Sequence, residues 1–489
     1  MARMSSLRHL SIALLYYSAA AVLSVDADAQ GIVPQGGEYS LLESIALRGD
    51  QSVPDISINS GGGYVTWHDN AIDSHGLGVG ARYLDSTFSP GLFGSFQVNN
   101  QTLGDQIRPQ VVTLANGGAA FVWEGGTNGA HNIFVRFLTP GRVFATTNDI
   151  RVNVYTNGTQ STPALAQLPN GNVIVAWNSL RQDGNMQGIF ARILNANGQF
   201  ITTPFQVNQY TNFNQRNPAV AVSSNGTVVI SWVSERQSNG SSVDFMMRRY
   251  DSTGQPLSDE VRVSTGTTIC ANPMASFRQS GGLTFVWAQR TTVDDDGWDI
   301  FARNFAADGT STNPPVVINT YRYGAQYSPK ISTLGSRQLV VWTSLGEDGS
   351  QEGVFARMLT DGFPAGEPFR VNTRTVSRQL NPVVGNDGSN HFVVVWASFT
   401  GVANGMDLFA QRYTLGEIPP TPAAPLVSPL WSSSLSVSWP SLSGYAVNRY
   451  EVYMDGAEPP AAPTGSVTNG NRWVANGLAP QSSHSCRLA

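Results

Sequence analysis

Lysine and cysteine are almost absent from this chain of 489 residues. Its two cysteines, Cys270 and Cys486, lie far apart, which excludes a disulfide framework as the basis of the fold. Lys330 is the single lysine, and the other 28 cations are arginines that form no basic run. Charged residues make up only 13% of the chain, where about 25% is usual, and the net charge is -5. We therefore expect no nucleic-acid partner.

Long apolar runs are missing beyond the N-terminus, so no membrane span is expected, because a span needs about 20 apolar residues. Arg3 and Arg8 precede an apolar stretch over residues 10–25, and an Ala-x-Ala sequence ends at Ala29. This is the pattern of a Sec-type signal peptide over residues 1–29. The sequence thus predicts a protein that is secreted or displayed on the cell surface.

Familiar catalytic motifs are also missing. The chain has no His-Glu-x-x-His, no Gly-x-Ser-x-Gly, no phosphate loop and no Cys-x-x-Cys. Zinc protease, serine hydrolase, nucleotide-binding and zinc-finger functions therefore lack support.

What the sequence does contain is a repeat of about 55 residues. Tryptophans recur at this spacing, at Trp67, Trp123, Trp177, Trp232, Trp287, Trp342 and Trp396. A proline stands 13 or 14 residues before each, at Pro54, Pro109, Pro163, Pro218, Pro273, Pro329 and Pro382. Two independent markers in step indicate seven copies of one structural unit.

Each copy is predicted to contain four short β-strands. In the third copy the strands are expected at Pro163–Leu168, Asn172–Trp177, Gly188–Leu194 and Pro204–Asn208, all rich in β-branched and aromatic residues. Asn170-Gly171 separates the first two, and we expect a tight hairpin with both central residues at positive φ. A second Asp-Gly or Asn-Gly turn recurs between strands two and three.

Four-stranded units with two apolar faces bury them by stacking radially, so we predict an all-β seven-bladed β-propeller over residues 30–418. The seventh copy lacks the Phe-x-Val-Asn strand found at Phe96–Asn99 and in other copies. Residues Glu38 to Ala46 occupy the corresponding place ahead of the first copy. We expect them to complete the last blade and to close the ring.

The composition changes after Pro419. Residues 419–425 read as a stiff proline-rich linker. Residues 426–489 then contain a Leu-Ser-Val-Ser-Trp strand ending at Trp439 and a Leu-Ala-Pro corner at Leu478. This part resembles a fibronectin type III domain, which implies a C-terminal β-sandwich. It departs from that family at His484 and ends before a seventh strand, so we expect an incomplete domain of a longer multidomain chain.

The repeats themselves carry a common pattern of Gln-x-x-Pro, Trp-x-Ser, Asp/Asn-Gly, Ile-Phe-Ala-Arg and Phe-x-Val-Asn. In this pattern they resemble modules found in tandem in large secreted bacterial surface proteins. The resemblance implies an extracellular scaffold or adhesion role, and it supplies no catalytic residue.

Residues present in nearly every copy are expected to be structural. Glutamines recur three residues before the proline, at Gln51, Gln106, Gln160, Gln215, Gln326 and Gln379, with Cys270 in the fifth copy. Arginines recur at Arg82, Arg136, Arg192, Arg248, Arg303 and Arg357. We interpret both sets as hydrogen-bonding groups that join successive blades, with a ligand-binding ring as the alternative for the glutamines.

Residues confined to one copy are better candidates for a site. The fifth copy gathers carboxylates at Asp294, Asp296 and Asp299, the oxygen ligands that Ca²⁺ prefers. The spacing is not that of an EF-hand loop, so an acidic solvated turn remains the alternative. No other cofactor is indicated. His68-Asp69 and Glu124 follow the first two tryptophans and could do acid/base work on a glycan, with surface positions as the alternative.

Aromatic residues among amides offer a ligand-binding rim on one face of the ring. They are Tyr155, Tyr210, Phe213, Trp298, Tyr321, Tyr323 and Tyr327. Such residues suit sugar stacking or protein binding, and loop packing is the alternative.

These patterns predict a secreted, non-enzymatic binding or adhesion protein whose partner is an extracellular glycan or a surface protein. The first alternative is a carbohydrate-active enzyme, a glycoside hydrolase or polysaccharide lyase, with its site at the propeller channel. The second is a purely structural repeat scaffold.

Overall fold

The computed structural model describes residues 31–42, 49–89, 94–127, 129–291, 297–401, 405–416, 426–440, 450–454, 464–467, 471–478 and 486–488. These residues divide into two compact units, one spanning residues 33–415 and the other containing residues 31–32 and 416–489. Every regular element in the described part is a β-strand. No described helix is long and apolar enough to cross a membrane. The signal peptide expected over residues 1–29 lies outside the described residues.

The larger unit is a series of antiparallel four-stranded meanders. The first three consist of β2 (Gln51–Asn59), β3 (Gly62–Asp69), β4 (Gly78–Leu84) and β5 (Phe96–Gln97); β6 (Asp105–Thr113), β7 (Ala119–Gly126), β8 (Asn132–Leu138) and β9 (Ile150–Arg151); and β10 (Gln160–Gln167), β11 (Val173–Leu180), β12 (Gln187–Leu194) and β13 (Phe205–Gln206). The bounds of β10 to β13 agree with the four strands predicted for the third copy to within a few residues.

The next meanders repeat this order. They consist of β14 (Gln215–Val222), β15 (Val228–Glu235), β16 (Val243–Tyr250) and β17 (Val261–Arg262); β18 (Thr268–Phe277), β19 (Leu283–Thr291), β20 (Asp299–Phe305) and β21 (Val316–Val317); and β22 (Gln326–Leu334), β23 (Arg337–Leu345), β24 (Glu352–Thr360) and β25 (Phe363–Arg370). One parallel pair, Val243 and Ile269, joins β16 to β18.

The last sheet combines the two ends of the repeat region. It contains β26 (Gln379–Asn386), β27 (His391–Gly401) and β28 (Gly405–Leu415), and β1 (Ile32–Ser40) lies along β28 as its fourth strand. The prediction that N-terminal residues complete the last meander is therefore confirmed. The strand itself starts and ends earlier than the predicted 38–46.

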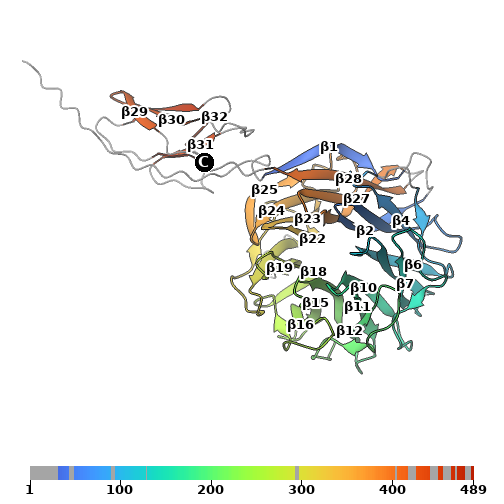
Figure 1. The fold of residues 1–489 in the computed structure, drawn as a ribbon. Helices are drawn as coiled ribbons and strands as arrows, with labels where there is room; N and C mark the ends of the chain where they lie inside the picture. The colour runs from blue at the N-terminus through green and yellow to red at the C-terminus, as the bar shows by residue number, and fades with distance from the viewer. Residues whose placement is uncertain are drawn as a thin grey trace, which may run out of the picture. The chain divides into compact units, whose positions relative to one another are not determined.

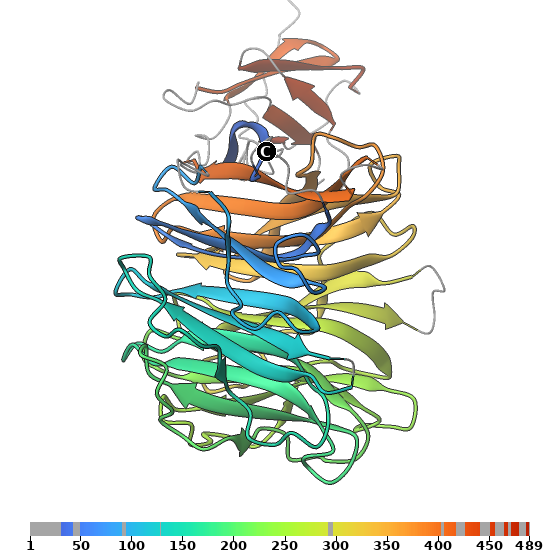
Figure 2. The same ribbon diagram turned by 90° about the vertical axis from the view of Figure 1, so that its right-hand side faces the viewer.

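The meanders form a closed ring. The first strand of each meander contacts the first strand of the next, and β26 contacts β2, so the series returns to its start. Figure 1 looks onto this ring with the first strands around the centre, and Figure 2 shows it from the side. The unit is thus a β-propeller, as the sequence predicted.

The repeated tryptophans form the packing between meanders. Each is at most 1% exposed. Trp177 of β11, for example, lies in one apolar cluster with Val122 and Phe137 of the preceding meander. A buried aromatic side chain removes about 150 to 250 Å² from water, so these contacts account for much of the ring's stability.

The hairpins between first and second strands correct one expectation. In the Leu168–Asn172 turn, Gly171 has a φ of +85°, and Asn170 is not among the residues at positive φ. The Gly171 amide donates to the Leu168 carbonyl, and the Leu168 amide donates to the Asn172 carbonyl. This is a three-residue loop with a glycine bulge rather than a two-residue turn, so only the glycine needs positive φ.

The smaller unit contains two three-stranded sheets. One is ordered β29 (Leu426–Trp431), β30 (Ser434–Ser438) and β33 (Arg472–Asn476), and the other β32 (Gly465–Val467), β31 (Tyr450–Met454) and β34 (Cys486–Leu488). Buried residues of β30 and β31 share one core with Trp439. His484 and the whole of the proposed linker, residues 419–425, lie outside the described residues.

Candidate functional site: the central channel

The first strand of every meander contains a β-bulge at the repeat proline. In β2 the pairing shifts between Ser52 and Asp55, so two residues, Val53 and Pro54, stand where one would normally oppose Trp67. The residue before each proline adopts positive φ, between 50° and 55°, at Val53, Arg108, Thr162, Asn217, Asn272, Ser328 and Asn381. This conformation is rare for residues other than glycine. Bulges re-aim side chains, and here they bring these residues to the centre of the ring.

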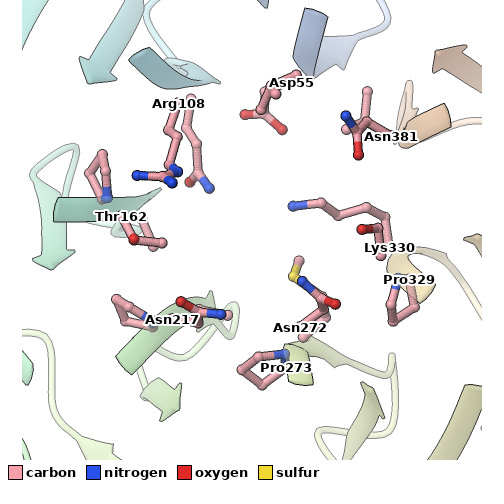
Figure 3. A pocket seen from close by; sticks show the side chains of 18 of the residues that line it. Asp55, Arg108, Thr162, Asn217, Asn272, Pro273, Pro329, Lys330 and Asn381 are labelled. Carbon is pink, nitrogen blue, oxygen red and sulfur yellow. The ribbon is translucent and has the colours of Figure 1, made fainter. Parts of the chain in front are cut away.

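Together these bulges line a central channel with a volume of about 530 Å³. Most of the polar side chains in its wall are uncharged, from Asn217, Asn272, Asn381, Gln110, Thr162 and Ser328. Figure 3 shows the asparagines, Thr162, Asp55, Arg108 and Lys330 around the opening. Neither the residue before the proline nor the residue after it was singled out by the sequence analysis.

Three charged residues line the channel, and they come from three different meanders. Asp55 and Lys330 each follow the repeat proline, in β2 and β22, whereas Arg108 precedes it in β6. The other meanders have Gln, Ala, Met or Val after the proline. A comparison of these two columns of the repeat would have revealed the asymmetry, and Lys330 is also the only lysine of the chain.

Asp55 is the only carboxylate among the described residues of the lining. Its Oδ2 accepts a hydrogen bond of 2.9 Å from the Val111 amide of the next meander. Burial raises the pKa of Asp55 to about 6, against the opposing effects of the positive charge of Lys330 and of backbone hydrogen bonds. The carboxyl group is therefore able to exchange a proton near neutral pH.

Glu124, a residue predicted for acid/base work, lies buried behind the channel wall. Its Oε2 is 2.9 Å from Arg108 Nη1, and its Oε1 is 2.6 Å from His131 Nδ1. Oε2 also accepts a hydrogen bond from the amide of Thr162, one of the residues at positive φ. Glu124 thus compensates the charge of Arg108 and fixes the next bulge.

The residue after the tryptophan has this fixing role in other meanders too. Asn178 Oδ1 accepts from the Asn217 amide, and Thr343 Oγ1 accepts from the Asn381 amide. This recurrence explains why the position is polar in these copies.

His68 and Asp69 also lie within the protein wall. His68 Nε2 is 2.7 Å from Ser52 Oγ, and burial together with the nearby Arg108 lowers the pKa of His68 to about 4. Asp69 is fully buried and accepts hydrogen bonds from Trp67 and Gln51. The alternative of surface positions is therefore wrong for Asp69, whereas His68 is half-buried, and neither residue lines the channel.

The aromatic residues predicted for a rim are spread over several junctions between meanders. The carbonyls of Tyr155 and Tyr210 accept side-chain hydrogen bonds from Asn153 and Asn208, which fix the loops. Phe213 has a φ of +60° and lies under the guanidinium group of Arg236.

The remaining aromatics lie at another junction. Tyr321 and Tyr323 meet edge to face with ring centroids 5.7 Å apart, and Tyr323 is 72% exposed. Tyr327 and Trp298 pack against the apolar core, and the Tyr327 hydroxyl donates to Glu352. Ligand binding by these residues stays a prediction.

The predicted calcium loop is described only at its end. Asp294 and Asp296 lie outside the described residues. Asp299 accepts a hydrogen bond of 2.7 Å from Asn319 and forms an ion pair of 2.6 Å with Arg322. Among the described residues no group of three or more acidic, histidine or cysteine side chains is placed to hold a metal ion.

The repeated arginines and four of the six repeated glutamines join successive meanders, as predicted, whereas Gln51 and Gln160 bond to Asp69 and Trp177 of their own meanders. Arg136 donates to the Val98 carbonyl at 2.7 Å, and the other repeated arginines contact the equivalent carbonyl of the preceding meander. Gln215 accepts from Asn208 at the end of the preceding fourth strand, as three other glutamines do in their copies.

Comparisons with known proteins give structural neighbours only. No protein-family model and no curated protein matches the chain. A protein of unknown function from Dyadobacter fermentans is similar at 13% identity with a TM-score of 0.47, over 63% of this chain and 94% of its own. An α-L-arabinofuranosidase from Fusarium graminearum matches at 11% identity and 0.45, over 63% and 92%. A Penicillium chrysogenum α-L-arabinanase complexed with arabinobiose matches at 13% and 0.44, over 63% and 93%.

Proposed function

We propose that this chain is a carbohydrate-active protein and that its site is the central channel of a seven-bladed propeller. The observation that carries the proposal is the convergence of Asp55, Lys330 and uncharged polar side chains on one cavity. A site in the channel agrees with the first alternative expected from the sequence, which is a carbohydrate-active enzyme. It does not agree with adhesion through the aromatic rim.

The channel wall suits a polyhydroxylated ligand. Side-chain amides both donate and accept hydrogen bonds, as sugar hydroxyls do. Within the described part of the chain, the side chains of Asn272, Asn381 and Gln110 have no protein partner. Ligand pockets commonly measure about 300 to 1,000 Å³, and the channel volume of about 530 Å³ falls in this range.

Asp55 is the residue we assign to proton transfer. A catalytic acid works best with a pKa near the working pH, and the pKa of Asp55 is raised to about 6. In hydrolysis or elimination of a glycosidic bond, Asp55 would protonate the leaving oxygen. We assign no nucleophile, because Glu124 is held by Arg108 and His131 behind the wall.

Glycan binding without turnover is the second candidate. It is favoured by the single carboxylate among the described lining residues, since most glycoside hydrolases use two carboxyl groups. The amides of Asn217, Asn272 and Asn381 would then bind a sugar and release it without a chemical reaction.

The setting we propose is extracellular. A signal peptide over residues 1–29 would direct secretion, and residues 426–489 would form a fibronectin type III-like module that spaces the propeller from further domains. The two three-stranded sheets around Trp439 support this reading of the smaller unit.

The full chain, incubated with a panel of immobilised polysaccharides, tests both candidates through the protein retained and the soluble sugar released. Turnover predicts release by the wild type and a loss of at least a hundredfold in Asp55→Asn with retention kept. Binding alone predicts retention without release, weakened in an Asn272→Ala, Asn381→Ala variant. If neither retention of the protein on the polysaccharide nor release of sugar changes with any of the three substitutions, the channel is not the site.

A further inference from the structure

Lys330 brings a positive charge to the channel, and the carboxyl group of Asp55 lies within reach of that charge. It follows Pro329 in β22, and its side chain extends into the opening in Figure 3. No described acidic residue forms an ion pair with its ammonium group. An ammonium group has three hydrogen-bond donors, and those of Lys330 therefore remain available to an anionic ligand.

The other cation of the channel is not available in this way. Arg108 Nη1 lies 2.9 Å from Glu124 Oε2, and Glu124 is almost fully buried. The guanidinium charge is therefore already neutralised. Lys330 is therefore the channel cation that is not held in an ion pair by a buried carboxylate behind the wall.

Asp55 is the second charge of the channel and lies close enough to Lys330 for the two charges to interact. Residues at the same position of the repeat, after the proline, carry the negative charge in the first meander and the positive charge in the sixth. The uncharged Asn217 and Asn272 line the part of the wall that lies across the opening from Asp55 in Figure 3. A ligand that contacts all of these groups needs one anionic group and several hydroxyls.

We propose that the channel selects a sugar residue with an anionic substituent, a carboxylate or a sulfate ester, whose negative group pairs with Lys330. This inference rests on the proposed carbohydrate function of the channel. The ammonium group is a compact point charge, which recognises either anion. The amides bind the hydroxyls, and one edge of the sugar meets Asp55.

The test compares acidic glycans with their neutral counterparts. Oligogalacturonate and its carboxyl-reduced form are one pair, and a carrageenan oligosaccharide and its desulfated form are the other. Their affinities for the full chain are measured at pH 7 and low salt by calorimetry. The wild type is expected to bind at least one acidic form about tenfold more tightly than its neutral form, the worth of a partly shielded ion pair.

Three variants locate the preference. Lys330→Gln is expected to lose the tenfold preference and keep the affinity for the neutral form, whereas Lys330→Arg retains most of the preference. Arg370→Gln removes one positive charge from the exposed surface of β25 and is expected to change nothing. The carboxylate and sulfate arms identify which anion is bound.

The outcomes separate this inference from the function on which it rests. Equal affinities for acidic and neutral forms, or a preference that survives in Lys330→Gln, overturn the inference while binding in the channel stands. Absence of binding to every glycan, acidic or neutral, overturns both the channel function and the inference.

Discussion

Arg82 Nη1 donates a hydrogen bond of 2.7 Å to the carbonyl oxygen of Leu41, 41 residues earlier in the chain. Five other arginines contact the fourth strand of the preceding meander in the same way. Leu41 in turn donates its amide to the Leu408 carbonyl of β28. The Arg82–Leu41 contact therefore joins the first meander to the last one and holds the ring closed.

Loss of this contact is expected to destabilise the ring as much as loss of an internal one. Arg82→Met and Arg192→Met should each lower the free energy of unfolding by about 2 kcal/mol, because each leaves a buried carbonyl without a charged donor. Urea unfolding of the full chain measures both. A cost below about 0.5 kcal/mol for Arg82→Met, with a normal cost for Arg192→Met, would show that the N-terminal strand does not close the ring.

The bulges at the repeat prolines predict opposite effects on stability for two substitutions. Val53 is a β-branched residue with a φ of 50°, whereas Asn272 holds the same conformation with a residue that tolerates it. Val53→Asn is expected to stabilise the protein by about 1 kcal/mol, and Asn272→Val to destabilise it by about the same amount. Thermal unfolding distinguishes these shifts. A Val53→Asn variant less stable than the wild type would contradict the assigned bulge geometry.

Glu124 and Asn178 occupy the same position of the repeat, but their substitution is expected to destabilise the protein to different extents. Glu124→Ala is expected to cost about 3 kcal/mol, because it leaves Arg108 and His131 without their carboxylate and the Thr162 amide without its acceptor. Asn178→Ala loses uncharged hydrogen bonds and is expected to cost about 1 kcal/mol. Denaturant midpoints of the two variants provide the comparison, and equal costs would argue against the ionic role of Glu124.

Stability should also depend on pH through Asp55. Its pKa is about 6 in the folded protein and 3.8 ordinarily, so the folded state binds more protons between these values. The stabilising contribution of Asp55 to the free energy of unfolding is therefore complete below about pH 4. It is lost as the pH rises through 6.

An Asp55→Asn variant lacks that dependence. We expect it to be more stable than the wild type by about 1 kcal/mol at pH 7 and no more stable at pH 3.5. His68, whose pKa is lowered to about 4, acts in the opposite sense, but it is present in both proteins and its effect cancels from the difference. A stability difference that stays constant from pH 3.5 to 7 would contradict the raised pKa.

The periodic residues predicted most of the fold. Trp177 and Pro163 fix the strand positions of their meander because the tryptophan fills the core between neighbours and the proline marks the bulge. Arg136 and Gln215 were assigned correctly as inter-blade groups for the same reason: a contact needed in every meander leaves the same residue in every copy.

The channel site was harder to predict, since its residues differ between copies. Asp55, Arg108 and Lys330 belong to meanders far apart in sequence, and only closure of the ring brings them together. Their direction depends on the bulge before each proline, a backbone feature that side-chain patterns alone do not reveal. Aromatic loop residues such as Tyr323 are easily recognised in the sequence. The residue type alone does not predict whether these side chains lie together in the folded protein.

The most direct test of the account is the structure of the full chain crystallised with whichever oligosaccharide of the panel it binds. We predict electron density for the sugar inside the central channel, with its anionic group at Lys330, its hydroxyls at Asn272 and Asn381, and one edge at Asp55. Density over Tyr210 and Tyr323 on the rim, with an unoccupied channel, would contradict the account and restore the rim as the binding face.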